Sequence, residues 1–85
     1  MSWFVYLIRS PKGYLYTGIT TDVIRRLKQH NQGIGSKWTR ANRPLTLVWS
    51  KEVKNRSIAS KLEHAIKNFS KNKKEKLVKG ELNVF

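Results

Sequence analysis

Tyrosine, arginine and histidine side chains recur at short intervals near the start of this 85-residue chain. Tyr6 and Tyr16 lie in two apolar runs separated by a Ser-Pro-Lys-Gly turn, and Arg26 precedes His30 by four residues. A phenol has a pKa of about 10, so a tyrosine acts as a base only where cations such as Arg26 or a nearby lysine favour the phenolate. A planar guanidinium can bind two phosphate oxygens and stabilise the charge of phosphoryl transfer. These residues also have structural explanations, because strand tyrosines are often half-buried and His30 could cap a helix.

Carboxylates are scarce in the chain, which limits the kinds of metal site that it can build. Hydrolysis of a phosphodiester usually needs a cation, and a hard divalent ion needs carboxylate oxygen. Asp22 is expected to cap a helix, Glu52 follows a strand, and Glu75 and Glu81 lie in a basic segment. Glu63 is therefore the candidate ligand for one metal ion held together with substrate phosphate. Alternatively, it pairs with Lys67 four residues later.

Residues 33–44 are expected to form a long loop, and long loops in small domains are often functional. The loop interleaves Trp38 with three cations that could contact phosphates while the indole stacks on a base: Lys37, Arg40 and Arg43. Trp38 could equally be local core. Gly18 would let the backbone approach a phosphate or a helix closely, or it simply marks the end of a strand.

The chain resembles the GIY-YIG nuclease signature in its order of residues. Tyr6 matches the tyrosine at the end of the first strand, and Tyr16-Thr17-Gly18 matches the Tyr-x-Gly of the second. The Arg-x-x-x-His of the next helix and the glutamate of a later helix also have counterparts, which are Arg26, His30 and Glu63. Phe4 stands where the motif name has glycine and Thr17 where it has isoleucine; neither position carries the chemistry.

This resemblance implies a small stand-alone domain over residues 1–85 that hydrolyses DNA phosphodiester bonds with one Mg²⁺ or Mn²⁺ ion. One of the two tyrosines would deprotonate or position the attacking water and the other would orient the scissile phosphate. His30 would be a proton shuttle or phosphate contact, and Glu63 the metal ligand. Because relatives include homing endonucleases and an excision-repair subunit, a role in DNA repair or processing is implied. A protein partner could supply target choice.

Net charge supports a nucleic-acid partner. Eighteen Lys and Arg against five Asp and Glu give +13, with a sequence pI near 10.6, and such a field attracts polyanions. DNA is favoured over RNA by the resemblance. The alternatives are a non-catalytic DNA- or RNA-binding module on the same scaffold and a ribosome-associated basic protein. The absence of cysteine excludes disulfides and thiol catalysis. No apolar run reaches the roughly 20 residues of a membrane span, so we expect a cytoplasmic protein.

The elements that must position these residues follow from periodicity. Strands are expected over 3–9, 14–19 and 45–50, with helices from 20–22 to Gly33, from Ser57 to Phe69 and over 71–79. This order predicts an α/β (α+β) sandwich in which helices flank a small three-stranded antiparallel sheet. The hairpin could place Tyr6 and Tyr16 side by side. The second helix is expected to bury a face that is centred on the following residues: Ile58, Leu62, Ala65, Ile66 and Phe69.

Convergence is the central expectation for the site. The two tyrosines share a strand face, and Arg26 and His30 are neighbours on one helix face. These residues should meet Glu63 in one cleft. A position of Glu63 on the opposite face of the sheet from Tyr16 would argue against a metal site.

Overall fold

Strand β1 (Trp3–Arg9) lies at the centre of a three-stranded antiparallel sheet of order β2-β1-β3. The computed structural model describes residues 2–84. Along the chain, β1 is followed by β2 (Leu15–Thr20), α1 (Val23–Asn31), α2 (Lys37–Ala41), β3 (Thr46–Val53), α3 (Arg56–Lys67) and α4 (Lys71–Val78). The predicted antiparallel sheet with flanking helices is confirmed, with one additional short helix, α2.

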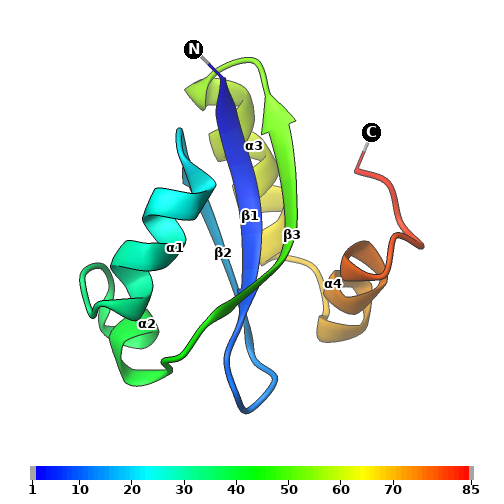
Figure 1. The fold of residues 1–85 in the computed structure, drawn as a ribbon. Coiled ribbons are helices and arrows are strands. Elements are labelled where there is room, and N and C mark those ends of the chain that lie inside the picture. Colours follow the sequence, from blue (N-terminus) through cyan, green and yellow to red (C-terminus); the bar gives the residue numbers. More distant parts are fainter. Residues whose placement is uncertain (1, 85) are drawn as a thin grey trace.

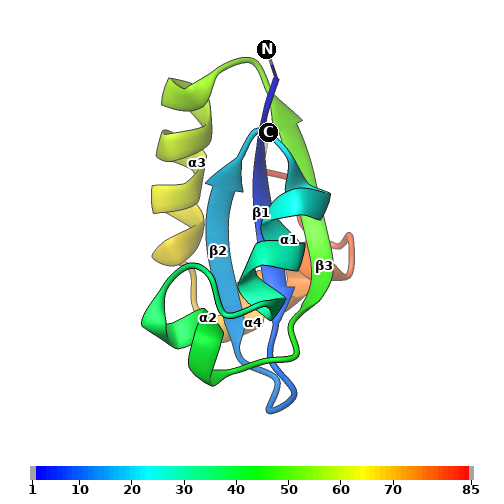
Figure 2. The same cartoon turned by 60° about the vertical axis from the view of Figure 1, so that its left-hand side comes forward.

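The two faces of β1 bury different cores, as its alternating apolar residues predict. Val5 and Leu7 pack in a cluster with residues of α3 and α4, whereas Tyr6 and Ile8 pack with residues of α1 and α2. Figures 1 and 2 show α1 and α2 on one side of the sheet and α3 and α4 on the other. The strand is therefore covered on both faces.

Each of the four helices begins at a side-chain N-cap. Asp22, Ser36, Asn55 and Ser70 each accept a hydrogen bond from the backbone N–H three residues later, which satisfies one of the N–H groups left free at a helix start. Ser36 thus begins a helix inside the segment that was predicted to be a loop. The predicted cap at Ser57 is wrong because Asn55 begins α3.

Helix α3 is rotated relative to the predicted face. Ala59, Leu62 and Ile66 are buried against the sheet, whereas Ile58 is 38% exposed and Ala65 is exposed. The apolar residues of this helix spread over a wide arc of its surface. The sequence pattern therefore shows where the arc lies, but it does not show which part of the arc contacts the sheet. Because positions 59 and 66 are four and three residues from Glu63, this carboxylate borders the buried face directly.

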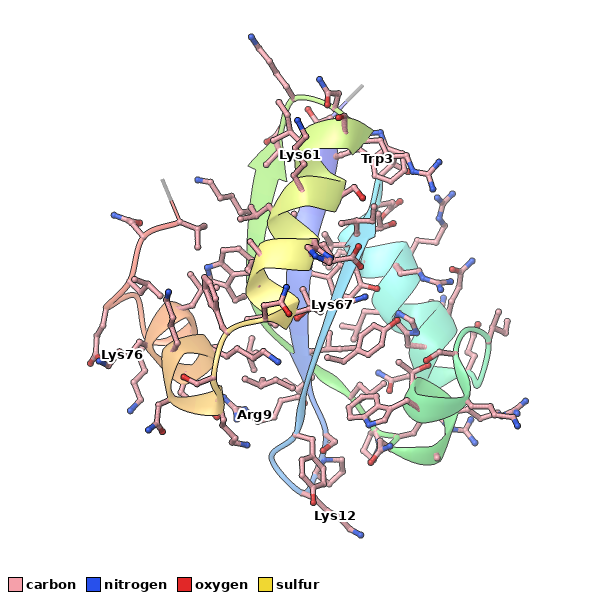
Figure 3. The ribbon with its side chains drawn as sticks, turned by 180° about the vertical axis from the view of Figure 1, so that it is seen from behind. Trp3, Arg9, Lys12, Lys61, Lys67 and Lys76 are labelled. Atoms are coloured by element: carbon pink, nitrogen blue, oxygen red, sulfur yellow. The ribbon has the colours of Figure 1, made fainter. Side chains whose placement is uncertain are left out.

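Helix α4 is fixed to the sheet by charges as well as by apolar contact. The Arg9 guanidinium donates two hydrogen bonds to Glu75, at 2.8 and 2.7 Å, and Arg9 is seen beside α4 in Figure 3. Lys71 donates to the carbonyl of Gly13 at 2.7 Å, and Leu77 is buried. This basic segment is therefore anchored to the strand and the turn, although most of its lysines are exposed. None of the helices within residues 2–84 is long and apolar enough to cross a membrane.

Candidate active site

A buried tyrosine–histidine pair forms the centre of the site. Tyr6 lies on the face of β1 that α1 covers, and His30 lies in the last turn of α1. Their exposed fractions are 2% and 0%, and the Tyr6 hydroxyl is 2.8 Å from His30 Nε2. Burial rules out the alternative in which His30 is only a solvated cap of the helix end. The hydrogen bond joins the first strand to the first helix inside the core.

The protonation states of this pair follow from burial. Burial, together with the nearby Tyr16 and Glu63, raises the pKa of Tyr6 to about 12, against the opposing effect of the Arg26 guanidinium. Burial, and secondarily Arg26, lowers the pKa of His30. The expectation that neighbouring cations favour a tyrosine phenolate is wrong for Tyr6, because desolvation outweighs Arg26. At neutral pH a neutral phenol therefore faces a neutral imidazole.

Two glycines provide the space that the pair occupies. Tyr6 is opposite Gly18 in the β1–β2 register, and a Cβ atom on Gly18 would lie 2.4 Å from the Tyr6 hydroxyl oxygen. A Cβ atom on Gly35, whose φ is +138°, would lie 2.8 Å from His30 Nδ1. The group that lies close to Gly18 is thus the Tyr6 side chain, and not a helix as one of the predicted alternatives had it. Gly35 was not predicted, because no motif marks it, although two glycines after a helix signal an unusual backbone.

Tyr16 lies on the same side of the sheet but not beside Tyr6. Its cross-strand partner is Ile8, so the two tyrosines are diagonal neighbours and the predicted side-by-side register is wrong. The Tyr16 ring meets His30 edge-on at 5.7 Å and stacks on Trp38 at 5.5 Å with an interplanar angle of 17°. Trp38 therefore belongs to the local core, which is one of the two predicted alternatives, while its stacking on a base stays a prediction.

Arg26 is the inward member of the basic pair on α1, as its spacing from His30 predicts. It is half-buried, whereas Arg25 is exposed. Its Nη1 donates to Gln29 Oε1 at 3.1 Å, and its charge acts on the pKa values of both Tyr6 and His30. The guanidinium thus lies close to both members of the buried pair.

Glu63 reaches the site from the other side of the sheet. Helix α3 packs with Val5 and Leu7, on the face opposite that of Tyr6 and Tyr16, so the expected single cleft on one face is not formed. This is the position of Glu63 that was expected to argue against a metal site. The carboxylate nevertheless contributes to the raised pKa of Tyr6, which places it within electrostatic reach of the phenol. Helix α3 contacts β2, the edge strand. Glu63 therefore acts on Tyr6 from across the sheet, while the other candidate residues lie on the face that α1 covers.

One carboxylate is the only acidic ligand that this arrangement offers to a metal ion. Within residues 2–84 no three His, Cys, Asp or Glu side chains lie together as a metal-binding group. The Glu63 side chain is 21% exposed, and its Oε2 lies 3.4 Å from Lys67 Nζ, which is the predicted alternative pairing. Lys67 lies on the α3 side of the sheet (Figure 3). Mg²⁺ often takes one or two carboxylates with substrate phosphate and waters, so Glu63 fits such an ion.

The three cations of residues 33–44 that were predicted to contact phosphates differ in their surroundings. Lys37 and Arg40 extend from α2 and are exposed. Arg43 donates to the Arg40 carbonyl at 3.0 Å and to the Asn31 carbonyl at 3.5 Å. Arg43 therefore also ties α2 to the end of α1, a role that its sequence position did not indicate.

Comparison with known proteins identifies relatives of this arrangement. The GIY-YIG catalytic domain family matches residues 2–76. A UPF0213 protein from Cronobacter sakazakii is 54% identical over 80 residues, covering 94% of this chain and 84% of the relative. A UPF0213 protein from Yersinia pestis is 55% identical over 76 residues, covering 89% and 80% of the two chains.

Two solved structures share the fold. The NMR structure of the UPF0213 protein BH0048 from Bacillus halodurans has a TM-score of 0.60 at 40% identity, and covers 93% of this chain and 84% of that one. The NMR structure of EF2693 from E. faecalis has a TM-score of 0.65 at 35% identity, with 94% and 85% covered.

Proposed function

Because the chain belongs to the GIY-YIG catalytic domain family, whose domains act on nucleic acids, we propose that it hydrolyses phosphodiester bonds in DNA with one Mg²⁺ or Mn²⁺ ion. The observation that carries this proposal is the environment of Tyr6. Its pKa responds to Tyr16, Arg26 and Glu63 as well as to burial, so a phenol, a guanidinium and a carboxylate lie within electrostatic range of its hydroxyl. A cation that stabilises phosphate charge and a group that positions water are what phosphoryl transfer uses.

The two tyrosines take different roles because their accessibility differs. Tyr6 is buried and its hydroxyl is already bonded to His30. Tyr16 is half-buried, and its hydroxyl makes no hydrogen bond with the described part of the chain. Tyr16 is therefore the tyrosine that contacts the attacking water, while Tyr6 and His30 hold Arg26 and the wall of the site in position.

Arg26 supplies the positive charge for the transition state. Water oxygen forms the new bond to phosphorus as the bond to the leaving oxygen breaks, and negative charge builds on the remaining phosphate oxygens. A half-buried guanidinium stabilises that charge better than an exposed one, because water screens it less. Glu63 would hold the divalent ion, which when bound lowers the pKa of water and polarises the phosphate.

A nicking assay on supercoiled plasmid tests this proposal. We expect nicking with Mg²⁺ or Mn²⁺ that EDTA stops, and Glu63→Gln and Arg26→Ala should each lower the rate by about 10²-fold or more. Glu81→Gln, which removes an exposed carboxylate from the C-terminal segment, is the matched control and should keep the rate. Undiminished nicking in both active-site variants, or none in any metal, would contradict the proposal.

One observation favours a second candidate, a nucleic-acid-binding module without useful turnover. Glu63 is paired with Lys67, so a metal ion must compete with an ammonium group. In that case Glu63→Gln would leave DNA affinity unchanged or tighter, because a carboxylate facing phosphate repels it, and no variant would change cleavage. Anisotropy and cleavage measured on the same oligonucleotide separate the two functions.

A further inference from the structure

A hollow of about 230 Å³ opens beside the site, where the hairpin approaches α4. Its lining comes from three elements and consists of Tyr14, Leu15, Trp38, Lys71 and Lys74. Trp38 stacks on Tyr16, so this hollow begins one ring away from the proposed position of the attacking water. Sites that enclose drug-sized ligands measure about 300–1,000 Å³. Because this hollow is smaller than such sites, it can hold a single flat group that is part of a longer ligand.

The aromatic residues of the hollow provide surfaces for stacking. Tyr14 is 55% exposed, and it lines the hollow that Trp38 also lines. Proteins that bind single-stranded nucleic acid stack bases on such exposed rings. A base in the hollow would extend the stack that Tyr16 and Trp38 already form.

The cations of the hollow differ in how far they are neutralised. Lys71 donates to the Gly13 carbonyl and lies 3.8 Å from Glu75 Oε2, with its ammonium 5.8 Å from the Tyr14 ring centroid. Lys74 is half-buried, and its side chain makes no ion pair or hydrogen bond within residues 2–84. An ammonium without an ion-pair partner, in a hollow that two aromatic rings also line, is complementary to the phosphate of a stacked nucleotide.

We propose that this hollow binds the base of an unpaired DNA nucleotide, with the phosphate of that nucleotide on Lys74. The inference rests on the proposed nuclease function and narrows its substrate to DNA that presents an unpaired base near the scissile phosphate. A base inside a continuous duplex is stacked and paired, so it could not enter. Because Trp38 lines the hollow and stacks on Tyr16, this pair of rings would fix the distance between that base and the bond to be cut.

Binding in EDTA tests this inference without any need for turnover. The probes are a labelled thymidine strand of about 12 nucleotides, an abasic strand of equal length and a blunt duplex. We expect wild-type protein to prefer the thymidine strand to the abasic one, and Tyr14→Ala to weaken binding of the thymidine strand about 5-fold or more. Tyr14→Ala should leave abasic and duplex affinities unchanged. Far-UV circular dichroism verifies that each variant is folded.

Two lysine variants on α4 complete the design. Lys74→Gln should weaken binding of both single strands, because it removes a phosphate contact, whereas Lys76→Gln, on the outer side of α4 (Figure 3), is the matched control. Equal affinities of wild type for thymidine and abasic strands, or no effect of Tyr14→Ala, would overturn the inference. That failure is independent of the nuclease proposal, which would fail if neither supercoiled plasmid nor a duplex that carries an unpaired thymidine is cut with Mg²⁺ or Mn²⁺ while base-dependent binding persists.

Discussion

At the scale of single residues, Tyr6 and Tyr16 show how one amino acid can serve two purposes in one site. Tyr6 is enclosed by β2, α1 and the core, and its hydroxyl has a partner. Tyr16 is covered on one side by Trp38 and retains a free hydroxyl. The two tyrosines differ in their chemistry only because they occupy different positions in the structure.

Removing each hydroxyl should therefore have opposite consequences. Tyr16→Phe should lower the nicking rate by about 10²-fold or more while changing the free energy of unfolding by less than about 0.5 kcal/mol. Tyr6→Phe should cost about 1–3 kcal/mol of stability, because it leaves a nitrogen of buried His30 without its partner. Urea denaturation and plasmid nicking measure the two effects. A larger rate loss in Tyr6→Phe with intact stability would reverse the assignment.

The buried His30 should make stability depend on pH. Its pKa is lowered by burial and then by Arg26, so below about pH 6.5 the unfolded chain binds a proton that the folded protein excludes. Stability is therefore complete above that pH and falls as the pH drops toward the folded pKa. We expect Tm to decrease between about pH 7.5 and 5, and His30→Gln to flatten this decrease.

The exposed His64 offers the comparison for this measurement. His64→Gln should keep the slope of the wild-type protein over the same pH range. An equal slope in wild type and His30→Gln would show that another group controls the transition.

At the scale of elements, periodicity predicts the strands and the longer helices well, because each carries a clear apolar pattern and a turn or cap at its ends. The 33–44 segment has no such pattern, and α2 forms there because Ser36 caps one turn and Trp38 packs on Tyr16. The buried face of α3 could not be predicted because its apolar arc is wider than its contact with the sheet. The packing of α3 on the sheet decides how close Glu63 lies to the candidate residues on the other face.

The bridge between β1 and α4 should be a measurable part of the stability of α4. Arg9 and Glu75 are 29% and 24% exposed and form two short hydrogen bonds, and Arg9 lowers the pKa of Glu75. Partial solvent screening reduces the value of such a pair, so we expect a coupling energy of about 1 kcal/mol. A double-mutant cycle with Arg9→Gln and Glu75→Gln in urea measures this coupling, and additive single effects would contradict it.

At the scale of the whole molecule, the charge of +13 should make DNA binding sensitive to salt. With about four to six phosphate contacts, the slope of log K against log salt for duplex DNA would be roughly −4 to −5. Exchanging Lys37 and Arg40 for glutamine should reduce the magnitude of this slope by about 2. Lys61→Gln, on the α3 side (Figure 3), is the control. A flat salt response would exclude phosphate contacts as the source of affinity.

The pairing of β1 with two partners at very different sequence distances has a consequence for how the domain folds. Tyr6 pairs with nearby Gly18 in β2 but with distant Ser50 in β3, and closing the longer loop costs more chain entropy. We expect the hairpin and α1 to associate before β3 docks. The tyrosine–histidine contact would then form early, and slowed amide hydrogen exchange in β1 and β2 during refolding should precede that in β3.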